Sequence, residues 1–297
     1  MASPSVRLIR QRSITHNNAI FWAAFTPDGK KLASASLDNT VKLWSVSDGE
    51  LLATVRGHGD GVAFVGFLSD GRMVTASLDR TLKIWTPDAT MATSTLTGHQ
   101  DYLGCATVSR TGALVASGGF DKTVRLWDAG GTLLAVFTGH SAPVQSVAIS
   151  SSGRLLASGG DDHSIRLWDI PSKQLSATLS GHELTVEALS FAPDDQLLAS
   201  GSGDGTVRFW SLEGSQRGTI DTRSGRIKSL AFSPDGLWLV TGGADGTVRA
   251  WDVSGLRALG ATPAHRNTVY CVTFHPGGKL LASAGFDRSV HIWEVAE

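Results

Sequence analysis

The chain has 297 residues, and 26 Lys and Arg stand against 27 Asp and Glu, which gives a formal net charge of −1. This balance argues against a dedicated nucleic-acid-binding protein, which would carry a basic excess, and two cysteines are too few for a disulfide scaffold and suit a reducing compartment. No apolar run reaches the roughly 18 residues of a membrane span, and residues 1–11 lack the apolar stretch of a signal peptide. We therefore expect a soluble, cytoplasmic protein.

A repeat marked by tryptophan runs along the chain. Seven of the nine tryptophans recur every 41 or 42 residues, at Trp44, Trp85, Trp127, Trp168, Trp210, Trp251 and Trp293. An aspartate stands six residues before each of them, at Asp38, Asp79, Asp121, Asp162, Asp204, Asp245 and Asp287. A Ser or Thr stands four residues before each aspartate, and a histidine 21 or 22 residues before it in six units, at His16, His58, His99, His140, His182 and His265. This constant register predicts seven equivalent units.

Each unit reads as four short strands in chain order. The histidine is followed by an apolar first strand, as at 186–191, and then by a turn such as 233–236. A second strand of small residues, as at 198–200, leads to a tight turn at the aspartate, and the third strand ends at the tryptophan. A fourth strand, as at 132–137, leads to the next unit. Four strands in a period of about 40–45 residues predict an all-β fold and are typical of a propeller blade.

The units resemble the WD40 repeat family. Four of them open with a Gly-His pair, at Gly57-His58, Gly98-His99, Gly139-His140 and Gly181-His182. Three close on Trp-Asp, at Trp127-Asp128, Trp168-Asp169 and Trp251-Asp252, and the others vary only the second residue. The resemblance covers nearly the whole chain, and the units lack insertions, as in simple bacterial WD40 arrays. It implies a seven-bladed β-propeller with four-stranded antiparallel blades.

The ends of the chain suggest how the ring closes. The seventh unit has no room for a fourth strand after Trp293, and the segment 1–15 precedes the first unit. We expect this segment to supply the outer strand of the seventh blade, because an open array would expose unpaired strand edges. Since the seven units use nearly all of the chain, we expect one domain, 1–297, without a further domain or linker.

The repeated polar residues look catalytic but have a structural interpretation. His99, Ser117 and Asp121 are the residue types of a hydrolase triad, yet the set recurs in six units, and an active site needs only one. The family resemblance implies a buried network instead, from His to Asp and from Ser or Thr to Trp. In the sixth unit Arg223 replaces the histidine, and an ion pair between Arg223 and Asp245 is one hypothesis for that unit.

We find no further candidates for catalysis, a cofactor or a metal. His163, His275 and His291 have no partner at metal-ligand spacing. Cys105 and Cys271 occupy the same place in the third and seventh units, which lie far apart on a ring, so we expect two small buried thiols and no disulfide. A phosphate-binding GxxxxGK[ST] loop does not occur in the sequence.

The family resemblance also implies where a partner binds. In WD40 propellers, contacts concentrate on the narrow top face around the channel. They involve the residues three and five after the histidine and the residue before the aspartate. At these positions, units seven, one, two and three carry large apolar side chains, which we call the apolar arc: Phe21, Leu37, Leu78, Tyr102, Phe120, Tyr270 and Phe286. Exposed clusters of this kind mark interaction sites.

Charged and bulky residues complete the expected face. Arg226 and Lys228 lie beside the arc and are expected to engage an acidic residue of a partner, whereas Asp161 and Glu187 lie opposite and are expected to engage a basic one. Phe21 and Tyr270 stand on neighbouring blades and are expected to sandwich an apolar or cationic side chain. We expect two bulky residues at an otherwise small position to fill the space between the first two blades, namely Trp22 and Phe64.

These observations predict a non-enzymatic scaffold, monomeric by itself, that binds a protein or peptide partner on the top face. Two alternatives stay open. A propeller enzyme with an active site at the channel mouth would need a non-repeating ionisable cluster, for which only Asp161, Glu187, Arg226 and Lys228 are available. A nucleic-acid-associated adaptor would need a basic face, which only Arg226 and Lys228 support. We expect no cofactor, no nucleic acid and no membrane partner.

Overall fold

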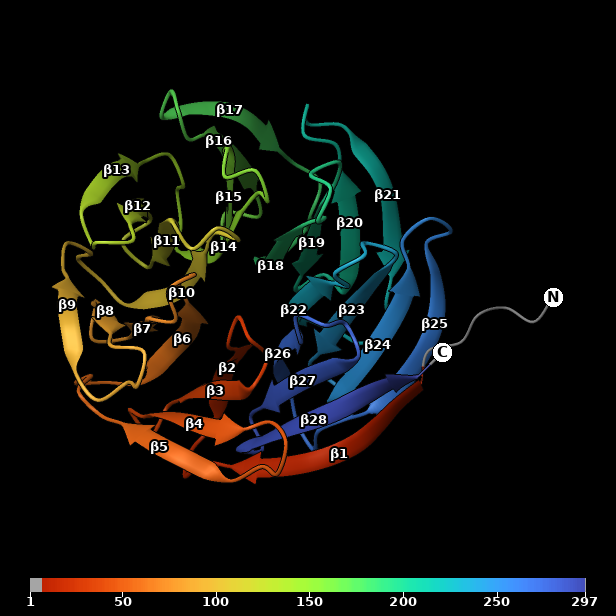
Figure 1. The fold of residues 1–297 in the computed structure, drawn as a ribbon. Helices are drawn as coiled ribbons and strands as arrows, with labels where there is room; N and C mark the ends of the chain where they lie inside the picture. The colour runs from red at the N-terminus through yellow and green to blue at the C-terminus, as the bar shows by residue number, and fades with distance from the viewer. Residues whose placement is uncertain (1–6, 297) are drawn as a thin grey trace.

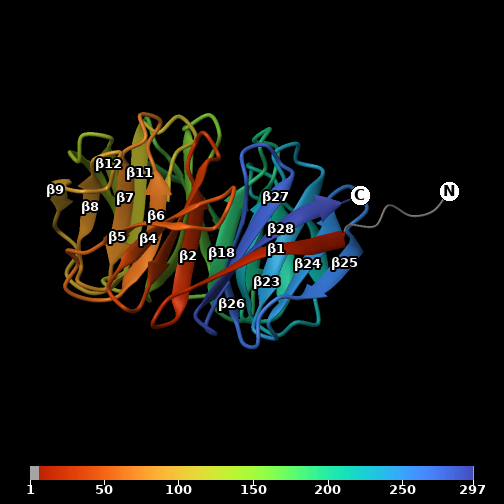
Figure 2. The same cartoon turned by 60° about the horizontal axis from the view of Figure 1, so that its bottom comes forward.

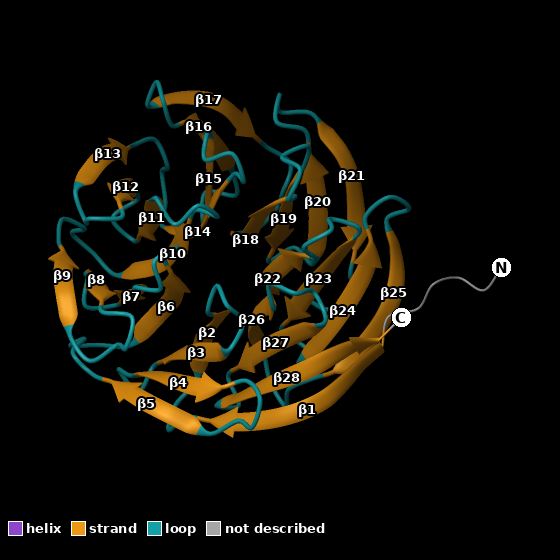
Figure 3. Ribbon diagram, viewed as in Figure 1, coloured by secondary structure: helices purple, strands orange, loops and turns teal. Residues whose placement is uncertain are grey.

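Seven four-stranded antiparallel sheets surround a central channel in the computed structural model, which describes residues 7–296 (Figure 1). The described part of the chain contains 28 strands, joined by turns and loops, and no helix (Figure 3). The prediction of an all-β, seven-bladed propeller is therefore confirmed. Each of the first six blades is formed by four consecutive strands, starting with β2–β5.

The strands fall into four classes by their place in a blade. The innermost strands are β2 (Ile20–Phe25), β6 (Val62–Phe67), β10 (Leu103–Val108), β14 (Val144–Ile149), β18 (Val186–Phe191), β22 (Ile227–Phe232) and β26 (Val269–Phe274). The second strands are β3 (Lys31–Ser36), β7 (Met73–Ser77), β11 (Leu114–Gly119), β15 (Leu155–Gly160), β19 (Leu198–Ser202), β23 (Trp238–Gly243) and β27 (Leu280–Gly285). The third strands are β4 (Val41–Ser45), β8 (Leu82–Trp85), β12 (Val124–Asp128), β16 (Ile165–Asp169), β20 (Thr206–Trp210), β24 (Thr247–Asp252) and β28 (Ser289–Ala296). The outer strands are β5 (Leu51–Val55), β9 (Ala92–Leu96), β13 (Leu133–Phe137), β17 (Gln174–Leu179), β21 (Gln216–Asp221), β25 (Arg257–Pro263) and β1 (Arg7–Thr15).

The N-terminal strand closes the ring. The seventh blade has the order β1-β28-β27-β26, and β1 pairs antiparallel with β28 from Arg7 opposite Ala296 to Thr15 opposite Ser289. Figure 2 shows β1 running beside β28 at the edge of this blade. Ile14 anchors the strand in a cluster with residues of the first and last blades, including Ile20 and Ile292. The closure that we expected from segment 1–15 is confirmed for β1, while residues 1–6 lie outside the described residues.

Small residues in the second strands allow the blades to pack closely. In β11 every residue after Leu114 is buried, because neighbouring blades cover both faces of the strand. A Cβ atom on Gly118 would lie 2.6 Å from a methyl group of Val144 in the next blade, so a larger residue would push the two blades apart. The outer strands are mostly exposed, as in β17, where only Leu179 is fully buried. The hydrophobic core therefore lies between the blades.

Candidate protein-binding face at the channel mouth

A buried polar network holds each blade together at its top end. In the third blade, His99 Nδ1 lies 2.9 Å from Asp121, and Ser117 Oγ lies 2.9 Å from His99 Nε2 and accepts the indole N–H of Trp127 at 3.1 Å. Five other blades repeat this arrangement, with His–Asp distances of 2.8 to 3.0 Å. The aspartate also accepts the backbone N–H groups of Gln100 and Thr123, which fixes the tight turn. The network is therefore present in space as the resemblance implied.

The protonation of the network suits a structural role. Burial lowers the pKa of five of the histidines, because desolvation outweighs the nearby carboxylate: His16, His99, His140, His182 and His265. Burial opposes ionisation of Asp204, but hydrogen bonds from Thr206 and His182 hold its pKa at about 2. The imidazole is thus neutral: it donates from Nδ1 to the carboxylate and accepts the hydroxyl proton at Nε2. Since Ser117 is fully buried, no substrate can reach its hydroxyl.

In the sixth blade, which has no histidine, an arginine binds the aspartate of the tight turn. Arg249 donates to both oxygens of Asp245, at 3.2 and 2.7 Å, and Thr241 still accepts the indole N–H of Trp251. The hypothesis of an ion pair between Arg223 and Asp245 is wrong. The backbone N–H of Arg223 bonds to Asp221, and Ser224 takes the place beside the second strand that histidine fills in other blades. Arg249 reaches Asp245 because it lies on β24, directly beyond the tight turn.

A bulge in every inner strand directs side chains toward the channel. In β2, Ile20 pairs with Ser36 and Trp22 pairs with Ala35, which leaves Phe21 as the extra residue of the ladder. The same shift occurs at the equivalent place in the other six inner strands. Because a bulge re-aims the side chains around it, the fifth and sixth residues after the histidine position both line the channel mouth in most blades.

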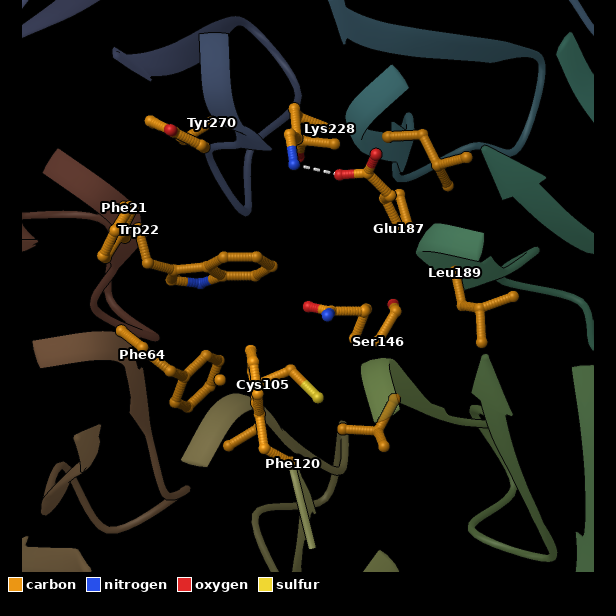
Figure 4. A pocket seen from close by; sticks show the side chains of 18 of the residues that line it. Phe21, Trp22, Phe64, Cys105, Phe120, Ser146, Glu187, Leu189, Lys228 and Tyr270 are labelled. Carbon is orange, nitrogen blue, oxygen red and sulfur yellow. Dashed lines mark ion pairs between the residues drawn. The ribbon is translucent and has the colours of Figure 1, made fainter. Parts of the chain in front are cut away.

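These side chains surround a hollow of about 300 Å³ at the channel mouth (Figure 4). Six of the eleven partner-binding residues that the sequence predicted line it, namely Phe21, Leu78, Phe120, Glu187, Lys228 and Tyr270. Each of the other five lies against one of the lining residues. Tyr102 packs on Phe120 and Phe286 on Tyr270, with ring centroids 6.1 and 6.3 Å apart, and half of the surface of Tyr102 and Phe286 is exposed.

The remaining three predicted residues join the face through other contacts. A Cβ atom on Gly61 would meet the side chains of both Leu37 and Leu78, so the two leucines lie close together beside this glycine. Asp161 accepts from the side chain of Gln145, which lines the hollow, at 3.1 Å, and from Thr185 at 3.0 Å. Arg226 donates to Glu187 at 2.6 Å. The structure therefore brings the predicted residues of all seven blades to one face.

The roles expected for the charged pairs need correction. Glu187 does not stand opposite the two cations, because one carboxylate oxygen binds Arg226 and the other binds Lys228. Its side chain is only 5% exposed, so it is not available to a basic residue of a partner. Arg226 keeps 55% of its side chain exposed. The three residues form one cluster with a net positive charge, while Asp161 lies on the neighbouring blade.

The aromatic sandwich also needs correction. Phe21 and Tyr270 already pack edge to face, with ring centroids 5.0 Å apart and planes at 87°. No side chain fits between them at that distance. Lys228 Nζ lies 5.9 Å from the centre of the Tyr270 ring, so a cation of the chain itself faces this aromatic surface.

Trp22 is a site residue that sequence reasoning assigned to packing. Its indole packs on Phe64 at 5.4 Å, which confirms contact between the first two blades. It also lines the hollow and extends across it toward the centre (Figure 4). The sequence indicates that Trp22 is exceptional, because the six equivalent residues of the other blades include four small ones, Cys105, Ser146, Ala188 and Ser229. A large residue at this place narrows the channel mouth.

The prediction of two buried thiols without a disulfide holds in part, because both cysteines are free but only Cys271 is fully buried, whereas Cys105 is partly exposed. Desolvation raises the pKa of each thiol to about 12. The sequence spacing suggested that His291 is isolated, but its ring stacks on that of His265, with the ring centroids 4.7 Å apart. A nitrogen of each ring and an oxygen of Asp287 lie within 4.8 Å of one another. No helix long and apolar enough to cross a membrane occurs among residues 7–296.

The chain is similar to several curated proteins over short stretches. It is 46% identical over 52 residues to Denticleless protein homolog A of Xenopus laevis, which is 18% of this chain and 7% of that protein. WD repeat-containing protein 86 of Homo sapiens is 41% identical over 49 residues, 16% of this chain and 13% of that protein. Ribosome assembly protein 4 of Saccharomyces cerevisiae is 42% identical over 43 residues, 14% of this chain and 8% of that protein. The matches thus span only a small part of each relative's length.

The family comparison covers far more of the chain. The family described as WD domain, G-beta repeat, matches seven segments, at residues 9–45, 49–86, 91–128, 131–169, 173–211, 214–252 and 257–294. Each segment contains one tryptophan of the repeat, and together they cover most of the chain. The chain therefore belongs to the WD40 repeat family, whose fold points to protein partners in general.

Proposed function

We propose that this protein is a non-catalytic interaction scaffold, and that a partner protein or peptide binds on the top face over the apolar arc and the hollow at the channel mouth. The observation that carries the proposal is the continuity of this surface. Phe286, Tyr270 and Phe21 pack in a chain, and Tyr102 packs on Phe120 across the hollow's rim. Clusters of aromatic side chains around a concave centre favour a protein interface.

The hollow fits an apolar side chain of the partner. Trp22, Phe64 and Phe120 supply aromatic surface on one side, and Leu189 lies on the other (Figure 4). Burial of an aromatic or aliphatic side chain there would contribute about 1.5–3 kcal/mol. Arg226, which is exposed beside the hollow, is placed to bind a carbonyl or carboxylate oxygen of the partner. The partner we propose therefore presents an apolar anchor with an acceptor group nearby.

The ionisable groups at the channel mouth favour binding over catalysis. Both oxygens of the Glu187 carboxylate are occupied by ion pairs with Arg226 and Lys228, so neither oxygen is directed at a substrate in the hollow. The Cys105 thiol lines the hollow, but its raised pKa leaves it almost wholly protonated and weakly nucleophilic at neutral pH. These features support a scaffold without an active site at this place. The two free thiols also support our proposal of a cytoplasmic location.

A paired set of variants tests the proposal. Tyr102→Ala combined with Phe286→Ala removes two half-exposed rings of the arc. Leu51→Ala combined with Leu133→Ala is the matched control, because these leucines are similarly exposed but lie on outer strands. Affinity capture from native cytosol, with quantification of each captured protein, should show loss of specific partners for the arc variant alone. The two variants should melt at similar temperatures.

The result that contradicts the proposal is equally concrete. If the arc variant captures the same proteins as the unmodified chain in the same amounts, the top face is not the binding surface. Equal losses for both variants would show instead that capture depends on scattered exposed apolar residues.

A further inference from the structure

A second hollow lies where the ring closes, away from the channel mouth. It has a volume of about 420 Å³ and lies between β1, the end of β25 and the start of β28. We call it the seam hollow and define it by six of the residues that line it: Arg10, Ser13, His265, Arg266, Asp287 and His291. Its two arginines are exposed, so solvent and ligands can reach it.

The hollow exists because the seventh blade lacks a basic residue that the other six blades have. Two residues before the repeat tryptophan, those blades carry a lysine or arginine, at Lys42, Lys83, Arg125, Arg166, Arg208 and Arg249. In the fourth blade, for example, Arg166 fills the corresponding space and donates to Gly139 O at 2.8 Å. The seventh blade has His291 there, and an imidazole is too short to fill the same space.

The closing strand supplies a guanidinium from another direction. Arg10 lies over the ring of Trp293 at 5.0 Å, much as Lys42 lies over Trp44 at 5.5 Å in the first blade. One Nη of Arg10 donates to Ala264 O at 3.3 Å. No partner for its other nitrogens, or for the guanidinium of Arg266, occurs within the described residues. Two guanidinium groups with free donors therefore face one hollow.

The single carboxylate of the hollow does not compensate for them. Asp287 accepts hydrogen bonds from His265 at 2.9 Å, from Ser289 Oγ at 2.7 Å and from the backbone N–H of Arg266 at 3.0 Å. Its acceptors are thus directed to the network of the blade. Burial is the main cause of the low pKa of His291, about 4, and the neighbouring His265 and Arg10 lower it further.

A cation would fit this group poorly, although two histidines and an aspartate are ligand types for zinc. The rings of His265 and His291 stack with 28° between their planes. Lone pairs of ring nitrogens lie in the ring planes, so nearly parallel rings cannot direct them at one ion. Both nitrogens of His265 are already bonded, to Asp287 and to Ser283. Two guanidinium groups nearby would also repel a metal ion.

We propose that the seam hollow binds a phosphate monoester, with Arg10 and Arg266 as its charged ligands, while the Ser13 hydroxyl is held by a hydrogen bond to Nδ1 of His291. A planar carboxylate is satisfied by one guanidinium fork, whereas a tetrahedral dianion presents acceptors to two guanidinium groups at once. The phosphate comes from a phosphorylated side chain of a protein or from a free ion, and the two sources differ in what lies beside the phosphate. This inference does not depend on the proposed function, because the seam hollow shares no residue with the channel mouth.

Calorimetric titration of the full chain at pH 7.5 tests the inference, at a constant ionic strength near the physiological value of about 0.15 M. The probes are inorganic phosphate and a blocked Gly-phosphoserine-Gly peptide, with the unphosphorylated peptide as reference. Arg266→Gln should weaken phosphate binding about tenfold or more. Arg110→Gln is the matched control, because Arg110 is exposed in the turn between β10 and β11 of the third blade and does not line the seam hollow, and it should bind as the unmodified chain does.

A change in phosphate binding by Arg266→Gln can be separated from a change in folding. Since the Arg266 side chain has no partner among residues 7–296, Arg266→Gln should melt at the same temperature as the unmodified chain without phosphate. Tighter binding of the phosphopeptide than of phosphate assigns the hollow to a phosphorylated side chain, and equal binding assigns it to the free ion. The inference is overturned if neither phosphate probe binds, or if Arg266→Gln and Arg110→Gln weaken binding equally.

Discussion

Thr241 accepts the indole N–H of Trp251 at 3.0 Å in the one blade whose network has no histidine. The same bond links Thr75 and Trp85 at 2.8 Å in the second blade, where His58 also lies 2.7 Å from the threonine hydroxyl. Both threonines are buried. The two blades thus offer a natural comparison of the network with and without its imidazole.

We expect Thr75→Ala to cost more stability than Thr241→Ala. Each variant leaves a buried indole N–H without its acceptor, but Thr75→Ala also leaves His58 Nε2 without its donor. One additional unsatisfied buried group costs about 1–3 kcal/mol. Urea unfolding of both variants measures the difference in the free energy of unfolding. Equal costs would show that the histidine contributes nothing through this hydroxyl.

Because β1 closes the ring, we expect the stability of the protein to depend on the buried side chains of this strand much more than on its exposed ones. Ile14→Ala removes a buried side chain from the cluster that joins the first and last blades, and we expect a loss of about 2–5 kcal/mol. Ile9→Ala is the control on the same strand, because Ile9 is 43% exposed, and it should cost about 1 kcal/mol or less. Thermal unfolding distinguishes them. Similar small losses for both would contradict a closing role for β1, as would an unchanged melting temperature after deletion of residues 1–15.

Substitution by alanine should reduce stability by different amounts at two glycines of the tight turns. Gly246 and Gly205 both have positive φ, 77° and 82°, so an alanine at either costs roughly 1 kcal/mol in backbone conformation. A Cβ atom on Gly246 would also lie 2.3 Å from the carbonyl oxygen of His265, whereas on Gly205 the nearest atom lies at 3.3 Å. Gly246→Ala should therefore lose about 1–3 kcal/mol more than Gly205→Ala. Chemical unfolding measures both, and equal losses would contradict this account of the contact between blades six and seven.

The buried histidines predict sensitivity to mild acid. Their pKa values are lowered in the folded state, to about 4 for His291, so between pH 6.5 and roughly 4 the unfolded chain binds more protons than the folded one. Stability contributed by these groups is complete above pH 6.5 and is lost as pH falls through this window. Scanning calorimetry from pH 7.5 to 4.5 should show a falling melting temperature.

The same measurement has an internal control. Repeating the scans in buffers of different ionisation enthalpy reports the protons taken up on unfolding, and this uptake should be larger at pH 5.5 than at pH 8, where imidazole contributes none. A melting temperature that stays constant from pH 7.5 to 5 would show that the histidines titrate alike in both states.

The fold could be predicted from the sequence because the same pattern of strands, turns and marker residues occurs seven times. The constant spacing of histidine, aspartate and tryptophan predicts seven four-stranded units and the closing strand, whereas the polar network is implied by the resemblance to the WD40 repeat family. The top-face positions are likewise implied by the family resemblance, and the structure adds a bulge at the same place in every inner strand, which directs these side chains to the channel.

What only the tertiary structure decided are the contacts between blades and at the one irregular turn. Glu187 pairs with Arg226 and Lys228, and Phe21 packs on Tyr270, because ring curvature brings neighbouring inner strands together at the channel mouth. Arg249 donates a hydrogen bond to Asp245 in the blade where Arg223 stands at the histidine position and has a positive φ. Sequence periodicity determines which face each side chain occupies, but the distance between side chains on different blades depends on how the closed ring packs.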